Sequence, residues 1–164
     1  MNTLAPDLIE LAEHLASALR RRGWKLATAE SCTGGLIAAT CTGLSGSSDW
    51  LDRGFVTYSN AAKTAQLGVP DHLIATHGAV SEPVAQAMAA GAVQHSLAQV
   101  SVAVTGVAGP TGGSPDKPVG TVWFGWATPG GVTTHHLVFA GDRDAVRQAA
   151  VVHALQGLLS RVQA

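Results

Sequence analysis

Leucines near the start of the chain recur at every third or fourth position. This spacing predicts a helix over residues 4–22 with one apolar face, formed by Leu4, Leu8, Leu11, Leu15 and Leu19. The same analysis predicts further helices over 36–42, from about 60, over 70–76, over 81–99 and from about 143 to near the end. Strands are expected at 24–29, 55–59, 100–105, 120–128 and 132–139.

The segment 120–128 is apolar on both of its faces, which is typical of a strand covered by helices on either side. The short Pro129-Gly130-Gly131 connection makes the next strand its antiparallel neighbour. Helices alternate with strands before this hairpin, and one helix follows it. We therefore predict an α/β fold, a three-layer α/β/α sandwich with a mixed, mostly parallel sheet, in a single domain over residues 1–164.

Composition excludes several functional classes. Hydrophobic residues make up 46% and charged residues 13% of the 164 positions, and the formal net charge is −1, so a nucleic-acid-binding surface is not expected. Two cysteines are too few for a disulfide framework. The start of the chain does not resemble a signal peptide, and no apolar run could span a membrane, so we expect a cytoplasmic protein.

Seven histidines raise the question of a metal site, but they are scattered along the chain. His135 and His136 are adjacent in a predicted strand and should point to opposite faces. His153 has no metal-ligating partner three or four residues away on its helix. We therefore expect neither a metal site nor a cofactor.

Chemically distinctive residues follow three predicted strands. Ser31 lies in a strand-to-helix turn and is followed by Gly34 and Gly35. It could be a helix N-cap or a nucleophile. The two glycines clear side chains from a helix N-terminus, where N–H groups could bind a phosphate or an oxyanion.

Lys63, one of three lysines, follows Tyr58 and the second predicted strand. It could be a solvated helix residue, or the base that activates a serine if burial lowers its pKa. A shift from ~10.4 to near 7 corresponds to about 4–5 kcal/mol, which only a largely closed apolar site could supply.

The third segment, 105–113, is glycine-rich without matching a phosphate-loop or dinucleotide fingerprint. It is either a flexible turn or a backbone nest for an anion or carbonyl oxygen. Arg143 opens the last helix and is either an ordinary exposed arginine or a phosphate clamp. Parallel strands would bring the three segments together at one edge of the sheet.

Six stretches, taken in order, resemble the C-terminal domain of the competence-damage-inducible CinA family. They are Ala29–Gly35, Tyr58-Ser59-Asn60 with Lys63 and Leu67-Gly68-Val69, Ala79-Val80-Ser81, Thr105–Pro110, Lys117–Val122 and Gly141-Asp142-Arg143. The resemblance extends from about residue 7 to the end. Thr111 stands where family members often carry glycine or an acid. Full-length CinA proteins have a larger N-terminal domain, which we expect to be absent here.

Stand-alone members of this family are nicotinamide-nucleotide amidohydrolases, so the resemblance implies hydrolysis of nicotinamide mononucleotide to nicotinate mononucleotide and ammonia. It implies that Ser31 attacks, that Lys63 accepts its proton, and that Tyr58 orients the lysine or relays the proton. Substrate contacts are expected from Thr33, Gly34, Gly35, Thr105, Gly106, Gly109 and Arg143. A homo-oligomer is also implied.

Two other functions remain open from the sequence. A non-catalytic module that binds a nucleotide or a protein in competence or DNA damage could keep the glycines, but it would not need Ser31 and Lys63. An amidase for a related substrate would have an apolar pocket with few polar contacts, and Arg143 argues against it.

Overall fold

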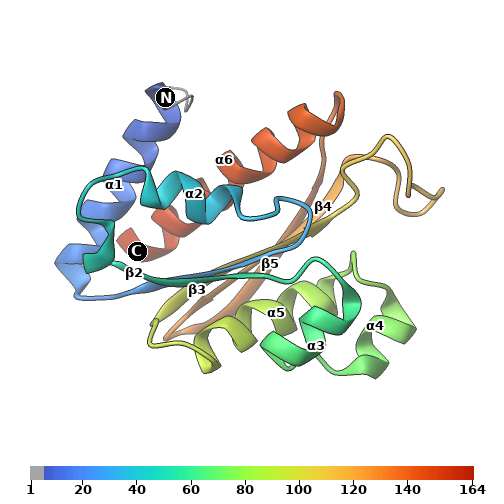
Figure 1. Cartoon of the computed structure of the whole chain (residues 1–164), viewed down its shortest axis with the longest axis horizontal. Helices are drawn as coiled ribbons and strands as arrows, with labels where there is room; N and C mark the ends of the chain where they lie inside the picture. Colours follow the sequence, from blue (N-terminus) through green and yellow to red (C-terminus); the bar gives the residue numbers. More distant parts are fainter. Residues whose placement is uncertain (1–5) are drawn as a thin grey trace.

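The computed structural model describes residues 6–164, so Leu4 of the predicted first helix lies outside the described residues. Helices and strands alternate from Pro6 to Leu67, after which two further helices, three strands and a last helix follow (Figure 1). The elements are α1 (Pro6–Arg22), β1 (Leu26–Glu30), α2 (Leu36–Thr42), a 3₁₀ turn (Ser47–Asp49), β2 (Leu51–Val56), α3 (Asn60–Leu67), α4 (Asp71–His77), α5 (Glu82–Gln94), β3 (Val100–Gly106), β4 (Thr121–Thr128), β5 (Gly131–Val138) and α6 (Arg143–Gln163).

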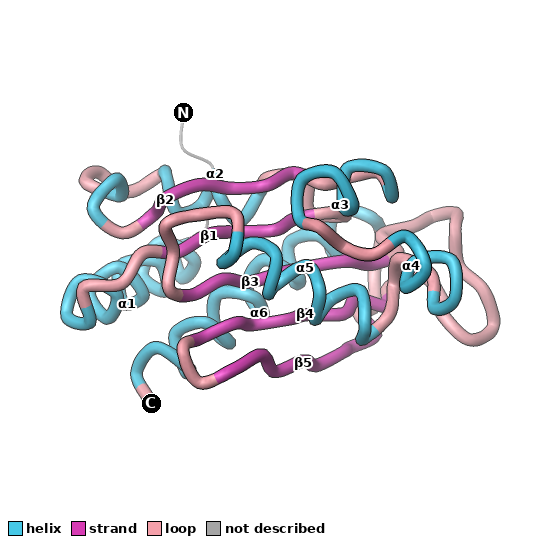
Figure 2. The backbone as a smooth tube through the Cα atoms, turned by 90° about the horizontal axis from the view of Figure 1, so that it is seen from below, coloured by secondary structure: helices cyan, strands magenta, loops and turns pink. Residues whose placement is uncertain are grey.

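Five strands form one sheet in the order β2-β1-β3-β4-β5 (Figure 2). Strand β1 pairs in parallel with both β2 and β3, whereas β4 is antiparallel to β3 and to β5. Strand β4 therefore runs against the other four, and the predicted mixed, mostly parallel sheet is confirmed. The parallel strands β1, β2 and β3 place their carboxyl ends at one edge, where ligands bind in open α/β sheets.

Helices cover both faces of the sheet, which confirms the three-layer fold. Helices α1, α2 and α6 lie on one face, and α3, α4 and α5 lie on the other (Figure 1). Large side chains such as Val102, Phe124 and Trp126 fill the first interface. The second is rich in alanine, and a Cβ on Gly125 would lie 2.6 Å from the Ala85 carbonyl oxygen, so α5 packs close to the sheet.

Two predicted boundaries were wrong. The strand expected at 55–59 is β2, Leu51–Val56, because the Thr57 amide donates to the Glu30 carbonyl and the chain then turns into α3. Ser59 caps that helix by accepting from the Ala62 amide. The helix expected over 81–99 ends at Gln94, and the next residues form a loop before β3.

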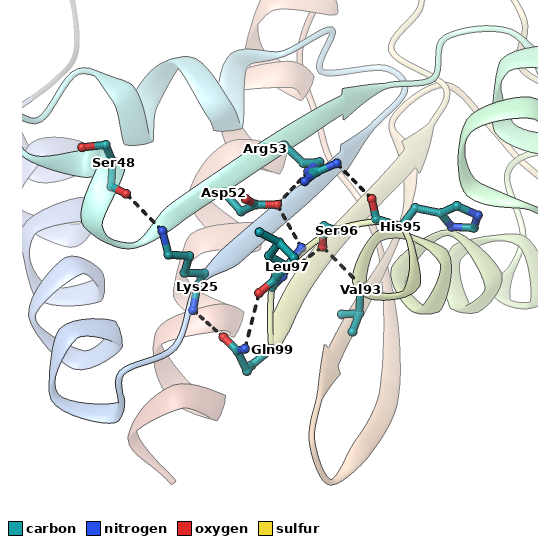
Figure 3. Close-up of polar contacts among 10 residues, drawn as sticks. Lys25, Ser48, Asp52, Arg53, Val93, His95, Ser96, Leu97 and Gln99 are labelled. Atoms are coloured by element: carbon teal, nitrogen blue, oxygen red, sulfur yellow. Dashed lines mark hydrogen bonds and ion pairs between the residues drawn. The ribbon is translucent and has the colours of Figure 1, made fainter.

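Polar contacts close the sheet at the edge where β1, β2 and β3 begin (Figure 3). The Asp52 carboxylate accepts from the Leu97 amide at 3.0 Å and from Arg53 Nε at 2.7 Å. The Lys25 amide donates to the side chain of Gln99. The Leu97 amide, followed by the Arg53 guanidinium, holds the pKa of Asp52 below its ordinary value. The amino ends of β1, β2 and β3 are therefore joined by structural contacts, and a ligand site is expected at their carboxyl ends.

Among residues 6–164, none of the helices combines the length and apolar character needed to cross a membrane.

Candidate active site

Ser31 begins the turn between β1 and α2. Its amide donates to the Val104 carbonyl at 2.9 Å, which attaches the turn to β3, and the residue is 8% exposed. The turn then passes through Gly34 (φ 57°) and Gly35 (φ 103°), in the left-handed region that glycine adopts without strain. The two glycines three and four residues after Ser31 therefore shape the turn from which helix α2 starts.

Lys63 reaches Ser31 from the fourth residue of α3. Its side chain is buried, at 1% exposure, and its Nζ lies 3.0 Å from Ser31 Oγ. The same nitrogen donates to the Thr57 carbonyl at 2.9 Å and approaches the Tyr58 carbonyl at 3.5 Å. The predicted pair of serine and lysine is thus brought within hydrogen-bond distance by two separate parallel strand ends.

Burial lowers the pKa of Lys63 below its ordinary value. The ion pairs formed by residues 6–164, Arg20 with Asp49 and Arg53 with Asp52, do not include this lysine. Burial raises the pKa of the neighbouring Cys32 thiol to about 11, so the thiolate charge that would raise the pKa of Lys63 develops only in alkaline solution. A buried lysine that forms no ion pair among residues 6–164 is suited to be a neutral base.

A cavity of about 270 Å³ opens in front of this pair. The residues that line it include six of the predicted site residues: Ser31, Tyr58, Lys63, Thr105, Gly106 and Arg143. The other lining residues are Cys32, Asn60, Ala79, Val80 and Ala108. A Cβ on Gly106 would lie 2.8 Å from the Val122 side chain, so only glycine fits this part of the wall without a shift.

Tyr58 and Arg143 meet at the mouth of the cavity. The tyrosine is 62% exposed, and its hydroxyl accepts from Arg143 Nη2 at 3.2 Å. Arg143 Nη1 donates to the Gly109 carbonyl at 2.8 Å. The part of Tyr58 that contacts Lys63 is therefore its backbone carbonyl, and its hydroxyl is occupied by the arginine.

Four other predicted residues do not line this cavity. Thr33 is fully buried, and its hydroxyl donates to Glu30 Oε1 at 2.7 Å. Gly34 and Gly35 shape the turn, and Gly109 contributes its carbonyl to Arg143. Thr105 does line the cavity, but its hydroxyl donates to the Ala79 carbonyl at 2.9 Å.

A second cavity of about 560 Å³ adjoins the first, and the two share Ala108 and Arg143. Its remaining walls come from Pro110 in the glycine-rich segment, from Val119 just before β4, and from residues 141–144 around the start of α6. Arg143 therefore stands between a small cavity at the serine and a larger one beside it.

Sequence analysis missed Glu30 and Arg147. The Glu30 carboxylate is fully buried beneath the turn, and Arg147 of α6 donates to the carbonyls of Cys32 and Thr33. Arg147 lies one helical turn after Arg143 and so on the same helix face. This spacing was the sequence signal that could have placed Arg147 near the site. Nothing in the sequence indicated that Glu30 would be buried.

His135 and His153 lie close together, with Nδ1 and Nε2 3.1 Å apart, although sequence spacing gave no such pairing. Within residues 6–164 no three His, Cys, Asp or Glu side chains form a group suited to hold a metal ion.

A family model, described as the CinA C-terminal domain, matches residues 8–162. The chain belongs to this family. It is 52% identical over 153 residues to nicotinamide-nucleotide amidohydrolase PncC of Escherichia coli K12, covering 93% of each chain. It is 54% identical over 149 residues to the protein of that name from Pseudomonas putida, covering 91% of this chain and 93% of the relative.

Solved structures of CinA-family proteins share the fold. Competence/damage inducible protein CihA from Agrobacterium tumefaciens is 43% identical, with a TM-score of 0.96 over the whole of both chains. A CinA superfamily protein from Klebsiella pneumoniae 700603 is 40% identical, with a TM-score of 0.91 over 95% of this chain and 98% of that one. The resemblance to the CinA family deduced from the sequence is thereby confirmed.

Proposed function

We propose that this protein is a nicotinamide-nucleotide amidohydrolase that converts nicotinamide mononucleotide and water to nicotinate mononucleotide and ammonia. The observation that carries the proposal is the 3.0 Å approach of the buried Lys63 Nζ to Ser31 Oγ at a cavity, with no ion pair to this lysine among residues 6–164. The amidohydrolase names of relatives that match nearly the whole chain support the choice of substrate.

In the first half of the reaction, neutral Lys63 accepts the Ser31 proton while Oγ attacks the carboxamide carbon. The lysine then returns that proton to the departing nitrogen, which leaves as ammonia and yields a nicotinoyl ester on Ser31. In the second half, Lys63 removes a proton from water, whose oxygen attacks the ester. Cleavage of the ester bond returns the proton to Ser31 Oγ and releases the carboxylic acid, whose remaining proton passes to solvent to give the carboxylate product.

Two backbone carbonyls assist the base. Donation from Nζ to the Thr57 carbonyl, with the Tyr58 carbonyl nearby, holds the lysine so that its lone pair can face Ser31 Oγ. Tyr58 contributes its main chain to the catalytic group, and its hydroxyl belongs to the substrate mouth with Arg143.

Substrate binding is assigned to the walls of the cavity. Thr105 and Gly106 line the same cavity as the serine and contact the carboxamide of the substrate. Arg143, exposed between the two cavities, is the cation for the nucleotide phosphate. Gly109 orients Arg143, and Thr33, Gly34 and Gly35 set the turn that carries the serine.

The single domain, the homo-oligomer and the cytoplasmic location stay predictions.

The decisive experiment is ammonia release from nicotinamide mononucleotide by the purified protein and by Ser31→Ala and Lys63→Ala. Both variants should lose at least about 10³-fold in kcat. Ser45→Ala and Lys25→Ala, which change the same residue types away from the cavity, are the matched controls. A folded parent that binds the nucleotide but releases no ammonia would overturn the enzyme assignment and favour a non-catalytic binding module.

A further inference from the structure

The turn that carries Ser31 contains two glycines with positive φ, and glycine is the residue that constrains a backbone least. Helix α2 begins at its end with Gly35 as N-cap, and Gly35 has no side chain to accept from the first helical amides. Such a turn needs external contacts to hold the serine within reach of Lys63.

Glu30 supplies contacts on one side of the turn. Its carboxylate, fully buried at the end of β1, accepts from the Ile37 amide at 2.8 Å and from the Ala38 amide at 3.0 Å. It also accepts from the Thr33 hydroxyl at 2.7 Å. The residue just before the serine thus caps the helix just after the turn, where a negative charge is favoured.

Arg147 supplies contacts on the other side. Its Nε donates to the Cys32 carbonyl at 3.1 Å and its Nη2 to the Thr33 carbonyl at 3.3 Å. A Cβ on Gly34 would lie 3.4 Å from the same Nη2, so the guanidinium packs directly against the turn. The Glu30 carboxylate thus accepts hydrogen bonds from the turn and from α2, whereas the Arg147 guanidinium donates hydrogen bonds to carbonyls of the turn.

We propose that Glu30 and Arg147 are positioning residues that hold the 31–35 turn and thereby set the 3.0 Å separation of Ser31 Oγ and Lys63 Nζ. Neither residue lines the cavity, so both act through the turn without touching substrate. The inference rests on the proposed function, in which Ser31 is the nucleophile.

The geometry predicts a specific kinetic signature. Misplacing a nucleophile by about 1 Å can reduce the rate about 10²-fold while leaving substrate contacts in place. Glu30→Gln and Arg147→Met should therefore lower kcat by about 10- to 100-fold with KM for nicotinamide mononucleotide changed less than about 3-fold. Arg147→Lys, which keeps one donor for the carbonyls, should recover part of the loss.

The experiment measures kcat and KM for these variants together with Ser31→Ala, at a temperature where circular dichroism shows each to be folded. Arg161→Met is the matched control for Arg147, because Arg161 also lies on α6 and donates to a backbone carbonyl, that of Gly157. Glu82→Gln is the control for Glu30. If Glu30→Gln fails to fold, the arginine series decides the matter.

Inactive Ser31→Ala with full kcat in Glu30→Gln or Arg147→Met would overturn the positioning role alone. A rise in KM at unchanged kcat would do the same, since it would make these residues substrate contacts. Retained activity in Ser31→Ala would instead overturn the proposed serine mechanism, so the two failures are distinguishable.

Discussion

The Tyr58 hydroxyl lies 3.2 Å from Arg143 Nη2, while the backbone carbonyl of the same tyrosine faces Lys63 Nζ at 3.5 Å. One residue therefore contacts both the base and the mouth of the cavity, through different atoms. Because the side chain contacts Arg143 and the main chain contacts Lys63, a substitution can remove the first contact and leave the second.

Tyr58→Phe removes the hydroxyl and keeps the carbonyl. With one of its two partners gone, Arg143 should bind phosphate less well, and KM should rise about 3- to 10-fold with kcat within about 3-fold of the parent. Steady-state kinetics on nicotinamide mononucleotide checks this. A fall in kcat of about 10²-fold at constant KM would instead assign a proton relay to the hydroxyl.

Activity should rise with pH through the pKa of Lys63. The base must be neutral, and burial holds its pKa below the ordinary lysine value. The pH profile of kcat/KM should therefore reach its plateau below about pH 10.4, the pKa of an exposed lysine. A profile that still rises beyond that pH would contradict a buried neutral base.

The same lysine gives stability a defined pH dependence. Between the folded pKa and about 10.4, only the unfolded chain holds the lysine proton, so the free energy of unfolding rises with pH. Lys63→Met should lack this contribution, and the parent should gain stability relative to it between pH 7 and 10. Urea unfolding across that range measures the difference, with the partly exposed Lys25→Met as control.

His153 should make the folded protein less stable at acidic pH. Burial, followed by the neighbouring His135 and Arg161, lowers its pKa below the ordinary value of 6.5. The unfolded chain therefore takes up this proton first as pH falls, and stability decreases below about pH 6.5. His153→Gln should show a smaller drop in Tm between pH 7.5 and 5.5, whereas His72→Gln in α4 should follow the parent.

Gly157 lies where α6 packs directly against Trp126 of the sheet. An added Cβ would overlap the ring of Trp126, whose Nε1 donates to the Ala154 carbonyl at 3.0 Å. Gly157→Ala should destabilise the protein by about 1–3 kcal/mol in urea unfolding. Gly130→Ala meets only Thr128 Oγ1 at 3.6 Å and should change stability far less.

Sequence reasoning predicted the fold well where patterns were strong. The first helix was found because its leucines recur with helical periodicity, and the hairpin after 128 was found because turn residues separate two strand-like segments. The second strand was displaced because β2 mixes Asp52, Arg53 and Gly54 with few apolar residues. As an edge strand it carries little of the core pattern on which such a prediction depends.

The clustering of candidate residues at one cavity was predicted as far as local motifs extend. Ser31, Lys63 and Arg143 follow strand ends or open a helix, and parallel topology brings those segments together. The substrate role expected of Thr33 depended on its neighbours in sequence, whereas its hydroxyl is taken up by Glu30. Long-range contacts such as Arg147 to Cys32 carry no local signature.

Arg147 and Cys32 are 115 positions apart, and α6 is the last helix of the chain. During synthesis, the serine and the lysine are both made long before the arginine that fixes the turn carrying the serine. On the proposed positioning role, a nascent chain should release ammonia at least about 10-fold more slowly until α6 docks. Ammonia release could then report completed folding, and splitting the gene before α6 would give a two-fragment sensor whose signal depends on reassembly.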